Sequence, residues 1–538
     1  REYGDAARIL SQYLGIRSVI LHSNNLQKRN SLIRVFGAAC VSLRPLPASV
    51  QPYNQKYLHE KVKDLGHGSE LIHGLSVVVT GVAGFIGSFL ARRLLEEGTA
   101  VIGVDNFQRF NDTDRKQQRL NHLPTHPKFV FHGSIDEVNW SSLGPIVVYH
   151  VAGQPGVRYC QENSELCATC NDKLTSRLLR KLVHKGTHVV FASSSTVYGT
   201  ASLATWNEDC DPKPTCVYAR SKMACEALLR DFAVNGMQAT VLCLFSVIGE
   251  DCRADLAPAV FMRQIAADAP IHINGDGSVQ RDFTYVGDIV DGMIRAAARS
   301  TRQEHPLRVF NLGRGEPRSI SALISILEEE LDTTATKVYN KAIAFEMPRT
   351  CAINTRAQTE LGFKPQIGLR EAVRRMLSEF RTRSIRFYGS KSLYFQFSNY
   401  APYEIILDGH TWPTSEHYYQ AQRFNAHPQL QREIRELSTP EEGFAASREF
   451  RKDVRDDWSE VKDGVMFVAV KAKFQQHLHL RALLLRTGTQ SLVEHTSKDH
   501  YWGDGGDGTG RNQMGKTLMA VRASLRSDAD KKTQAGGC

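Results

Sequence analysis

The sequence contains no apolar run that approaches the roughly 20 residues needed to cross a bilayer, so we expect no membrane-spanning segment. It has no internal repeat and no low-complexity tract, and domain boundaries must therefore come from changes of pattern. Its 11 cysteines form no paired CxxC motifs. Cys167 and Cys170 make a lone CxxC, which we interpret as a helix face rather than a metal or redox site. The odd count and the terminal Cys538 argue against a disulfide framework and indicate a reducing, cytoplasmic compartment.

With 538 residues, the chain is too long for one hydrophobic core and should form about two to four domains. Its net charge of +10 is a weak indication of nucleic-acid binding. Residues 1–72 hold 10 Lys and Arg against 5 Asp and Glu, whereas residues 383–538 hold 22 against 19. The last third thus has no strong basic stripe by count. The chain begins at Arg1 within a motif, and we expect its natural N-terminus to lie upstream.

A glycine-rich turn follows a buried strand that begins near Leu75. The segment "LSVVVTGVAGFIGSFLARRLLEEG" places Gly81, Gly84 and Gly87 between this strand and an apolar helix. That spacing allows a tight turn, close approach of a pyrophosphate and packing of the helix on the sheet. Asp105 follows the next predicted strand, where a carboxylate can bind a ribose hydroxyl. The pattern predicts dinucleotide binding rather than an accidental glycine turn.

A second set of polar residues follows a later strand, "VVFASSSTVYG". Tyr218 and Lys222 lie four positions apart, which places them on one helical face. Lys222 can electrostatically favour the phenolate of Tyr218, which would then act as a base while Ser194 holds the substrate oxygen. An isolated pair of this kind would be read as surface residues, but its place after the glycine turn favours catalysis.

From about Leu75 to Arg381 the chain resembles the extended short-chain dehydrogenase/reductase family, and specifically UDP-sugar 4-epimerases of the UDP-glucuronate type. The segments "HVAGQPGVRYCQEN", "RDFTYVGDI" and "VFNLGRGEP" extend the resemblance. It implies that NAD is held by the glycine turn, Asp105, Tyr218 and Lys222, and accepts a hydride from the sugar. It also implies that Arg281 contacts the nucleotide diphosphate. Ser134 and the loop "SVIGEDCRADLAP" depart from the family pattern.

The last third holds an ordered series of aromatic and polar residues that suits a flat, polar ligand. In "TSEHYYQAQRF" we expect Ser415 to cap a helix whose first turn carries Glu416. Glu416 can be either an active-site carboxylate or a partner of the helix dipole. The loop "GDGGDGTGRN" lacks the spacing and closing Glu of an EF-hand, so we predict no metal site.

The segments "DGHTWPTSEHYYQAQRF", "VMFVAVKAKF" and "SKDHYWGDGGDGTGRNQMGKTLMAVR" resemble the YbiA-like or NADAR family of N-glycosidases, which acts on riboflavin intermediates. The resemblance implies that Glu416 is the main carboxylate, Asp499 a second acid/base group and Trp458 a stacking platform. Substrate contacts are then expected from the following residues: Lys473, Trp502, Gly503 and Asn512. Lys473 could instead attack ribose C1 through a Schiff base, but a phosphate-binding or snorkelling lysine is the favoured interpretation.

Residues 1–72 resemble the C-terminal portion of GTP cyclohydrolase II, through the pattern "N…YLHEK…LGH". That family's zinc-binding cysteines would lie upstream of Arg1, and "SNNL" and "YLHEK" depart from its motifs. We therefore expect an inactive structural or dimerisation segment. A homodimer is left open. The segment is also a link to riboflavin synthesis, because the cyclohydrolase opens that pathway.

These observations predict an α/β multidomain chain with four parts. They are a small α/β cyclohydrolase-like fragment (1–72), a Rossmann-type doubly wound parallel sheet (73–382), a mostly helical α+β YbiA-like domain (383–526) and a flexible tail (527–538). The expected function is hydrolysis of the C–N glycosidic bond of ribosylaminopyrimidine 5-phosphates, small nucleotide-like substrates, with no cofactor needed for this step.

Three alternatives stay open at this point. The first is an ADP-ribosyl-guanine hydrolase, which alone would bring nucleic acid as a partner. The second is a UDP-sugar 4-epimerase as the main activity. The third is a scaffold whose Rossmann domain binds NAD structurally.

Overall fold

The computed structural model describes Val19–Ile20, Val41–Ser42 and residues 76–535, apart from gaps at 109–112, 122, 124–125, 144–145, 183–185, 200–204, 300–306 and 343–346. The chain divides into two compact units, Arg1–Gly68 and Ser69–Cys538. In the first unit, β1 (Val19–Ile20) pairs in parallel with β2 (Val41–Ser42). The rest of the predicted cyclohydrolase-like segment lies outside the described residues.

A seven-stranded parallel sheet organises the middle of the chain, as the sequence predicted. Its order is β13-β8-β7-β6-β3-β4-β5. The first strand of this sheet along the chain is the interior strand β3. The strands β4 and β5 follow on one side of it, and the chain then crosses to β6 on the other side, which makes β3/β6 a topological switch point. The strands are β3 (Ser76–Thr80), β4 (Val101–Val104), β5 (Phe129–His132), β6 (Ile146–His150), β7 (His188–Ser194), β8 (Gln238–Leu244) and β13 (Leu307–Leu312).

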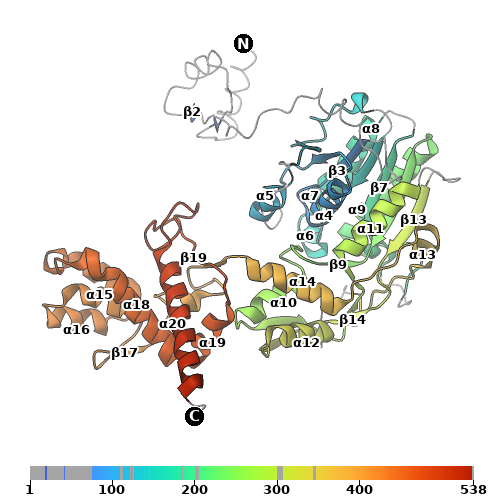
Figure 1. Cartoon of the computed structure of the whole chain (residues 1–538). Coiled ribbons are helices and arrows are strands. Elements are labelled where there is room, and N and C mark those ends of the chain that lie inside the picture. The colour runs from blue at the N-terminus through green and yellow to red at the C-terminus, as the bar shows by residue number, and fades with distance from the viewer. Residues whose placement is uncertain are drawn as a thin grey trace. The chain divides into compact units, whose positions relative to one another are not determined.

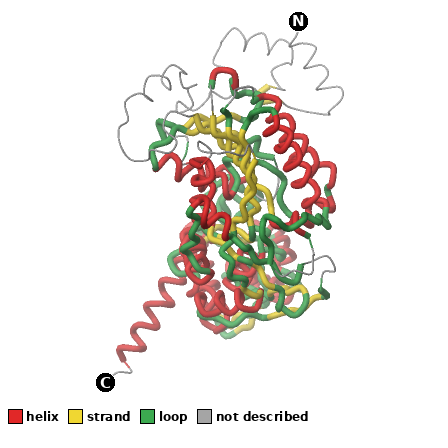
Figure 2. Tube along the Cα trace, turned by 90° about the vertical axis from the view of Figure 1, so that its right-hand side faces the viewer, coloured by secondary structure: helices red, strands yellow, loops and turns green. Residues whose placement is uncertain are grey.

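Helices cover both faces of this sheet, because alternate strand residues point to opposite sides. Val77 and Val79 join one core with α4 (Phe85–Glu96), α11 (Val286–Arg299) and α13 (Thr355–Leu361). Val78 joins the opposite core with α8 (Leu174–Lys181) and α9 (Val217–Val234). Figure 2 shows helices on either side of the strands. The apolar strand residues are therefore buried on both sides, as a parallel sheet requires.

A third core lies beside the sheet and contains α10 (Ala257–Ala266), α12 (Ile320–Leu331) and α14 (Leu369–Thr382). It also includes β10 (Ile271–Asn274), which pairs in parallel with the exposed strand β15 (Lys337–Asn340). Cys167 is buried in the short helix α7 (Ser164–Ala168), and Cys170 follows it in a π-helical turn.

The C-terminal region is mostly helical, as predicted, and is coloured orange to red in Figure 1. Its helices are α15 (Ser415–Ala421), α16 (Pro428–Glu436), α17 (Pro440–Glu449), α18 (Trp458–Gln476), α19 (Leu478–Arg486) and α20 (Gln513–Ala535). Two small sheets accompany them: β16 (Ile385–Phe387) with β19 (Leu492–Glu494), and β17 (Ile405–Leu407) with β18 (His410–Trp412).

The last helix continues beyond the boundary expected at residue 526. Residues 527–535 contain no Gly or Pro, so nothing in that stretch interrupts α20 before Ala535. Within the part of the chain that the structure describes, no helix is both long and apolar enough to span a membrane.

Candidate active sites

The glycine turn after β3 is tightly packed. Gly81 has a φ of +74°, and a Cβ atom there would lie 2.7 Å from the amide nitrogen of Ala152. A Cβ atom on Gly87 would lie 2.1 Å from the carbonyl oxygen of Gly81. Gly84 precedes the first residue of α4. The N-terminus of α4 therefore follows β3 after this short turn, and its amides and helix dipole favour a phosphate group there.

Asp105 follows β4 and connects this strand to the glycine turn. Its Oδ2 atom accepts a hydrogen bond from the amide of Ala83 at 3.1 Å, and its Oδ1 atom accepts one from the amide of Phe107 at 2.8 Å. Lys116, which the sequence analysis did not single out, places its Nζ atom 3.3 Å from Oδ1. The carboxylate thus lies at the carboxyl end of the strands, where the sequence predicts contact with a ribose hydroxyl.

Ser194, Tyr218 and Lys222 come together beside this turn. Ser194 ends β7, and its Oγ atom accepts a hydrogen bond from the Thr196 hydroxyl at 3.0 Å. Lys222 is buried in α9, where its Nζ atom donates to the carbonyl oxygen of Ala192 at 2.8 Å. The same Nζ atom lies 6.0 Å from the centroid of the Tyr218 ring.

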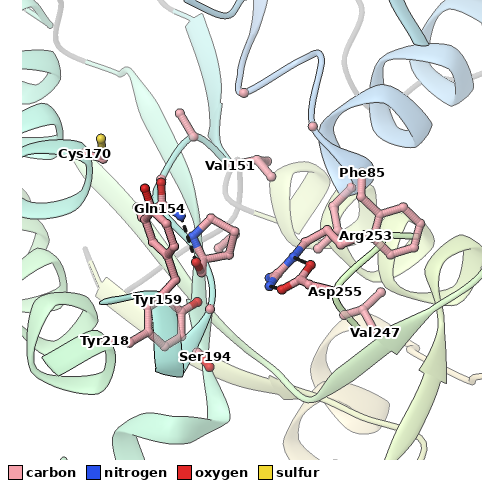
Figure 3. Close-up of a pocket in the computed structure, with 18 of the residues that line it drawn as sticks. Phe85, Val151, Gln154, Tyr159, Cys170, Ser194, Tyr218, Val247, Arg253 and Asp255 are labelled. Atoms are coloured by element: carbon pink, nitrogen blue, oxygen red, sulfur yellow. Dashed lines mark hydrogen bonds and ion pairs between the residues drawn. The ribbon is translucent and has the colours of Figure 1, made fainter. Parts of the chain in front are cut away.

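All three side chains line one cavity of about 1180 Å³, which Gly81, Gly84 and Asp105 also line. Figure 3 shows Tyr218 and Ser194 on one side of it and Phe85, Arg253 and Asp255 on the other. The Nε atom of Arg253 and the Oδ1 atom of Asp255 lie 3.0 Å apart. This pair belongs to the loop "SVIGEDCRADLAP", and the sequence did not identify it as part of a site. Its Arg-x-Asp spacing was the available signal.

Two predicted residues lie outside the cavity lining. Gly87 packs α4 against the turn, and Arg281 donates to the carbonyl oxygen of Met347 at 2.7 Å. Ser134 does line the cavity. The close-packed turn, the carboxylate of Asp105 and the size of the cavity fit a dinucleotide such as NAD together with a second ligand.

In the C-terminal region, Glu416 is held at the start of α15. Thr414 caps this helix, because its Oγ1 atom accepts from the amide of His417 at 3.2 Å and its φ of −148° is extended. The prediction that Ser415 is the cap was wrong. Ser415 is already the first helical residue, and its buried hydroxyl has no hydrogen-bond partner.

The carboxyl group of Glu416 is buried, with 3% of the residue exposed. Its Oε1 atom accepts from Gln420 Nε2 at 2.7 Å, and its Oε2 atom accepts from the side-chain amide of Asn399. Burial raises the pKa of Glu416 to about 7, and hydrogen bonds from Gln420, Asn399 and Tyr400 oppose that shift. Such a group changes charge near neutral pH, which suits acid/base or electrostatic catalysis.

Aromatic rings adjoin Glu416 through Tyr419. The Tyr419 ring centroid lies 5.0 Å from that of Trp458 and 5.5 Å from that of Trp502. Arg423 places its Cζ atom 5.8 Å from the Trp458 centroid, and its buried Nε atom has no hydrogen-bond partner. Trp412 instead belongs to the core, where it packs edge-on against Tyr418.

Asp499 lies at the start of the glycine-rich loop that follows β19. Asp499 Oδ1 accepts from the amides of Tyr501 at 2.7 Å and Trp502 at 2.8 Å. A Cβ atom on Gly503 would lie 2.8 Å from the carbonyl oxygen of Asp499. The amides of Gly505, Gly506, Gly508 and Gly510 all donate to oxygens of Asp499 or Asp504. These four amides are therefore engaged within the loop itself.

Asn512 and Lys473 have their polar atoms engaged by the backbone. Asn512 accepts from the amide of Glu494 at 3.0 Å and donates to the carbonyl oxygen of Leu492 at 2.9 Å. Lys473 is fully buried, and its Nζ atom donates to the carbonyl oxygens of Gln396 at 2.9 Å and Ser398 at 2.8 Å. Burial lowers the pKa of Lys473 to about 7.

Sequence reasoning missed Asn399 and Glu494. Lys473 anchors the backbone segment that contains Asn399. The side chain of Asn399 in turn donates a hydrogen bond to Glu416. Glu494 is buried at the end of β19, and a charged residue closing an apolar strand was the available signal.

Among the described residues, no group of three or more His, Cys, Asp or Glu side chains is arranged to hold a metal ion.

Two regions of the chain match known protein families. Residues 77–313 match the model of the NAD dependent epimerase/dehydratase family, and residues 386–526 match the NADAR domain. UDP-glucuronate 4-epimerase 4 of Arabidopsis thaliana is 36% identical over 334 residues, which cover 57% of this chain and 76% of that protein. N-glycosidase YbiA of Escherichia coli (strain K12) is 49% identical over 141 residues, which cover 26% of this chain and 88% of that protein.

A solved structure shares the fold of the middle region. UDP-glucuronic acid 4-epimerase from Bacillus cereus, in complex with UDP-glucuronic acid and NAD, is 30% identical and has a TM-score of 0.53. The similarity covers 57% of this chain and 99% of that one. NAD is thus bound in a homologous structure.

Proposed function

The chain belongs to the NAD dependent epimerase/dehydratase family through its middle region and to the NADAR family through its C-terminal region, and we propose from this premise that its principal activity is hydrolysis of an N-glycosidic bond. The observation that carries the proposal is the buried carboxyl group of Glu416, held by Asn399 and Gln420 beside the Tyr419–Trp458 ring pair.

The proposed substrates are ribosylaminopyrimidine 5-phosphates, early intermediates of riboflavin synthesis. Aromatic rings such as Trp458 and Trp502 suit a flat pyrimidine. The nearly balanced charge of residues 383–538, with 22 Lys and Arg against 19 Asp and Glu, favours a small ligand over a nucleic-acid strand.

The chemistry follows from the charge that develops as the bond breaks. Cleavage of the C1–N bond builds positive charge on the ribose, and the ionised carboxylate of Glu416 stabilises that charge. Asp499 serves as the second acid/base group and accepts the proton of the attacking water. Trp458 holds the base in place by stacking.

The test uses the full chain and its Glu416→Gln variant, with released ribose 5-phosphate followed by mass spectrometry. We expect the variant to lose at least about 100-fold in kcat, the usual effect of removing a transition-state stabiliser. Glu460→Gln, which alters an exposed carboxylate of α18, is the matched control and should keep full activity. An ADP-ribosyl-guanosine oligonucleotide is assayed in parallel. Release of ADP-ribose alone would overturn the pyrimidine substrate in favour of guanine de-ADP-ribosylation.

A UDP-sugar 4-epimerase activity is the second candidate, favoured by the meeting of Ser194, Tyr218 and Lys222 in the cavity of the glycine turn. A bound NAD would supply the hydride acceptor. Tyr218 would move the proton of the sugar 4-hydroxyl, with Ser194 holding that oxygen and Lys222 favouring the phenolate.

Formation of UDP-galacturonate from UDP-glucuronate tests this second activity. We expect Tyr218→Phe to abolish it while the exposed control Tyr339→Phe leaves it unchanged. Equal rates for the wild type and Tyr218→Phe would contradict the assignment.

A further inference from the structure

Glu494 lies in the interior of the C-terminal region with its backbone held on both sides. Its amide donates to Asn512 Oδ1 at 3.0 Å, and its carbonyl oxygen accepts from the amide of Asp504 at 2.9 Å. The residue is 6% exposed. No described residue donates a hydrogen bond to its carboxyl group, in contrast to Glu416, which has Asn399 and Gln420. Glu494 is therefore a buried and rigidly placed acid without a compensating partner.

The backbone places Glu494 close to Asp499, because a Cβ atom on Gly503 would lie 3.0 Å from the carbonyl oxygen of Glu494 and 2.8 Å from that of Asp499. The groups that act electrostatically on Glu494 are all carboxylates. They come from α15 and from the loop after β19, and they are Asp499, Glu416 and Asp504. Burial, with these like charges, raises the pKa of Glu494 to about 8, so the carboxyl group keeps its proton at neutral pH. Asp504 differs, because His495 and backbone amides stabilise its ionised form and lower its pKa.

A protonated acid beside a second carboxyl group supplies what glycosidic cleavage needs. Two carboxyl groups in different environments can divide the acid and base roles between them. Asp499 already accepts two amide hydrogen bonds on Oδ1, which suits an acceptor of protons. Glu494, with no donor bound to it, is free to give its proton away.

We propose that Glu494 is the catalytic acid that protonates the leaving nitrogen, an inference that rests on the proposed N-glycosidase function. The C1–N bond breaks with its electron pair moving to nitrogen, which takes the proton of Glu494. The water oxygen bonds to C1 and gives one proton to Asp499. Return of that proton from Asp499 to Glu494, through solvent, restores both groups with one water consumed.

The experiment compares the full-length wild type, Glu494→Gln and the exposed control Glu460→Gln on two substrates. One is the ribosylaminopyrimidine 5-phosphate, whose leaving nitrogen needs a proton. The other is a nitrophenyl riboside 5-phosphate, whose leaving group departs without one. We expect Glu494→Gln to lose at least about 100-fold in kcat on the first substrate and under about 5-fold on the second. Glu460→Gln should match the wild type on both.

The pH profile gives an independent reading. In the wild type kcat should fall above pH 8 as Glu494 ionises, and in Glu494→Gln this alkaline decline should disappear from the residual activity. Equal losses on both substrates with an unchanged alkaline limb would overturn the assignment to Glu494 while leaving the glycosidase intact. A wild type that cleaves neither substrate would overturn the proposed function itself, and the proposal for Glu494 with it.

Discussion

At the scale of single residues, burial governs the ionisable side chains of the C-terminal site. Glu416 and Glu494 have raised pKa values of about 7 and about 8, and Lys473 has a lowered pKa of about 7. Desolvation is the largest cause in each case, and it always disfavours the charged form. Three groups that would ordinarily be charged at neutral pH therefore titrate close to it.

This burial makes the stability of the protein depend on pH. The pKa of Glu494 is about 8 in the folded chain and about 4.3 in an unfolded one, so the folded state binds the proton more tightly. Its stabilising contribution is complete below pH 4 and is lost as pH rises to 8. Relative to the wild type, Glu494→Gln should gain unfolding free energy on the order of 4 kcal/mol between pH 5 and pH 9. Denaturant titrations at the two pH values measure this gain, and a pH-independent difference would contradict it.

At the scale of elements, the start of α15 fixes the position of Glu416. Thr414 satisfies the free amide of His417, whereas the hydroxyl of Ser415 bonds to nothing. Thr414→Ala should destabilise the protein by about 1–2 kcal/mol, the usual effect of losing an N-cap, and lower N-glycosidase activity as the helix start loosens. Ser415→Ala is the matched control and should be neutral or slightly stabilising, because it removes an unpaired buried hydroxyl. Thermal unfolding distinguishes the two, and the reverse order would show that Ser415 is the cap.

At the scale of the whole molecule, the region of the proposed N-glycosidase site has nearly balanced charge by count. The excess of Lys and Arg in residues 383–538 is 22 against 19. A small phosphorylated substrate contacts few cations, so kcat/KM should change less than about 5-fold between about 50 and 200 mM salt. A nucleic-acid substrate held by several phosphate contacts would lose on the order of 1000-fold over that range. Steady-state kinetics at the two salt concentrations measure the difference.

The two regions also differ in what could be predicted. The glycine turn is a local feature, since Gly81, Gly84 and Gly87 act within one strand–helix connection, and the parallel sheet around it followed from apolar strands alternating with helices. The helical character of residues 383–526 could also be predicted from the sequence. The cap of α15 was not, because Thr414 and Ser415 are both good capping residues and only the backbone angles choose between them.

The sequence by itself determined the nucleotide-binding fold of the middle region and the helical character of the C-terminal region, because periodicity and short-range motifs encode them. The choice of Glu416, Trp458 and Asp499 as candidates followed from the resemblance of the last third to the YbiA-like family. Only the tertiary structure decided the surroundings of these groups. It buried Glu494 among three carboxylates, directed Asn399 to Glu416 and engaged Lys473 and Asn512 with backbone atoms. The physical reason is that desolvation and hydrogen bonding depend on segments far apart in the chain, which meet only when the core closes.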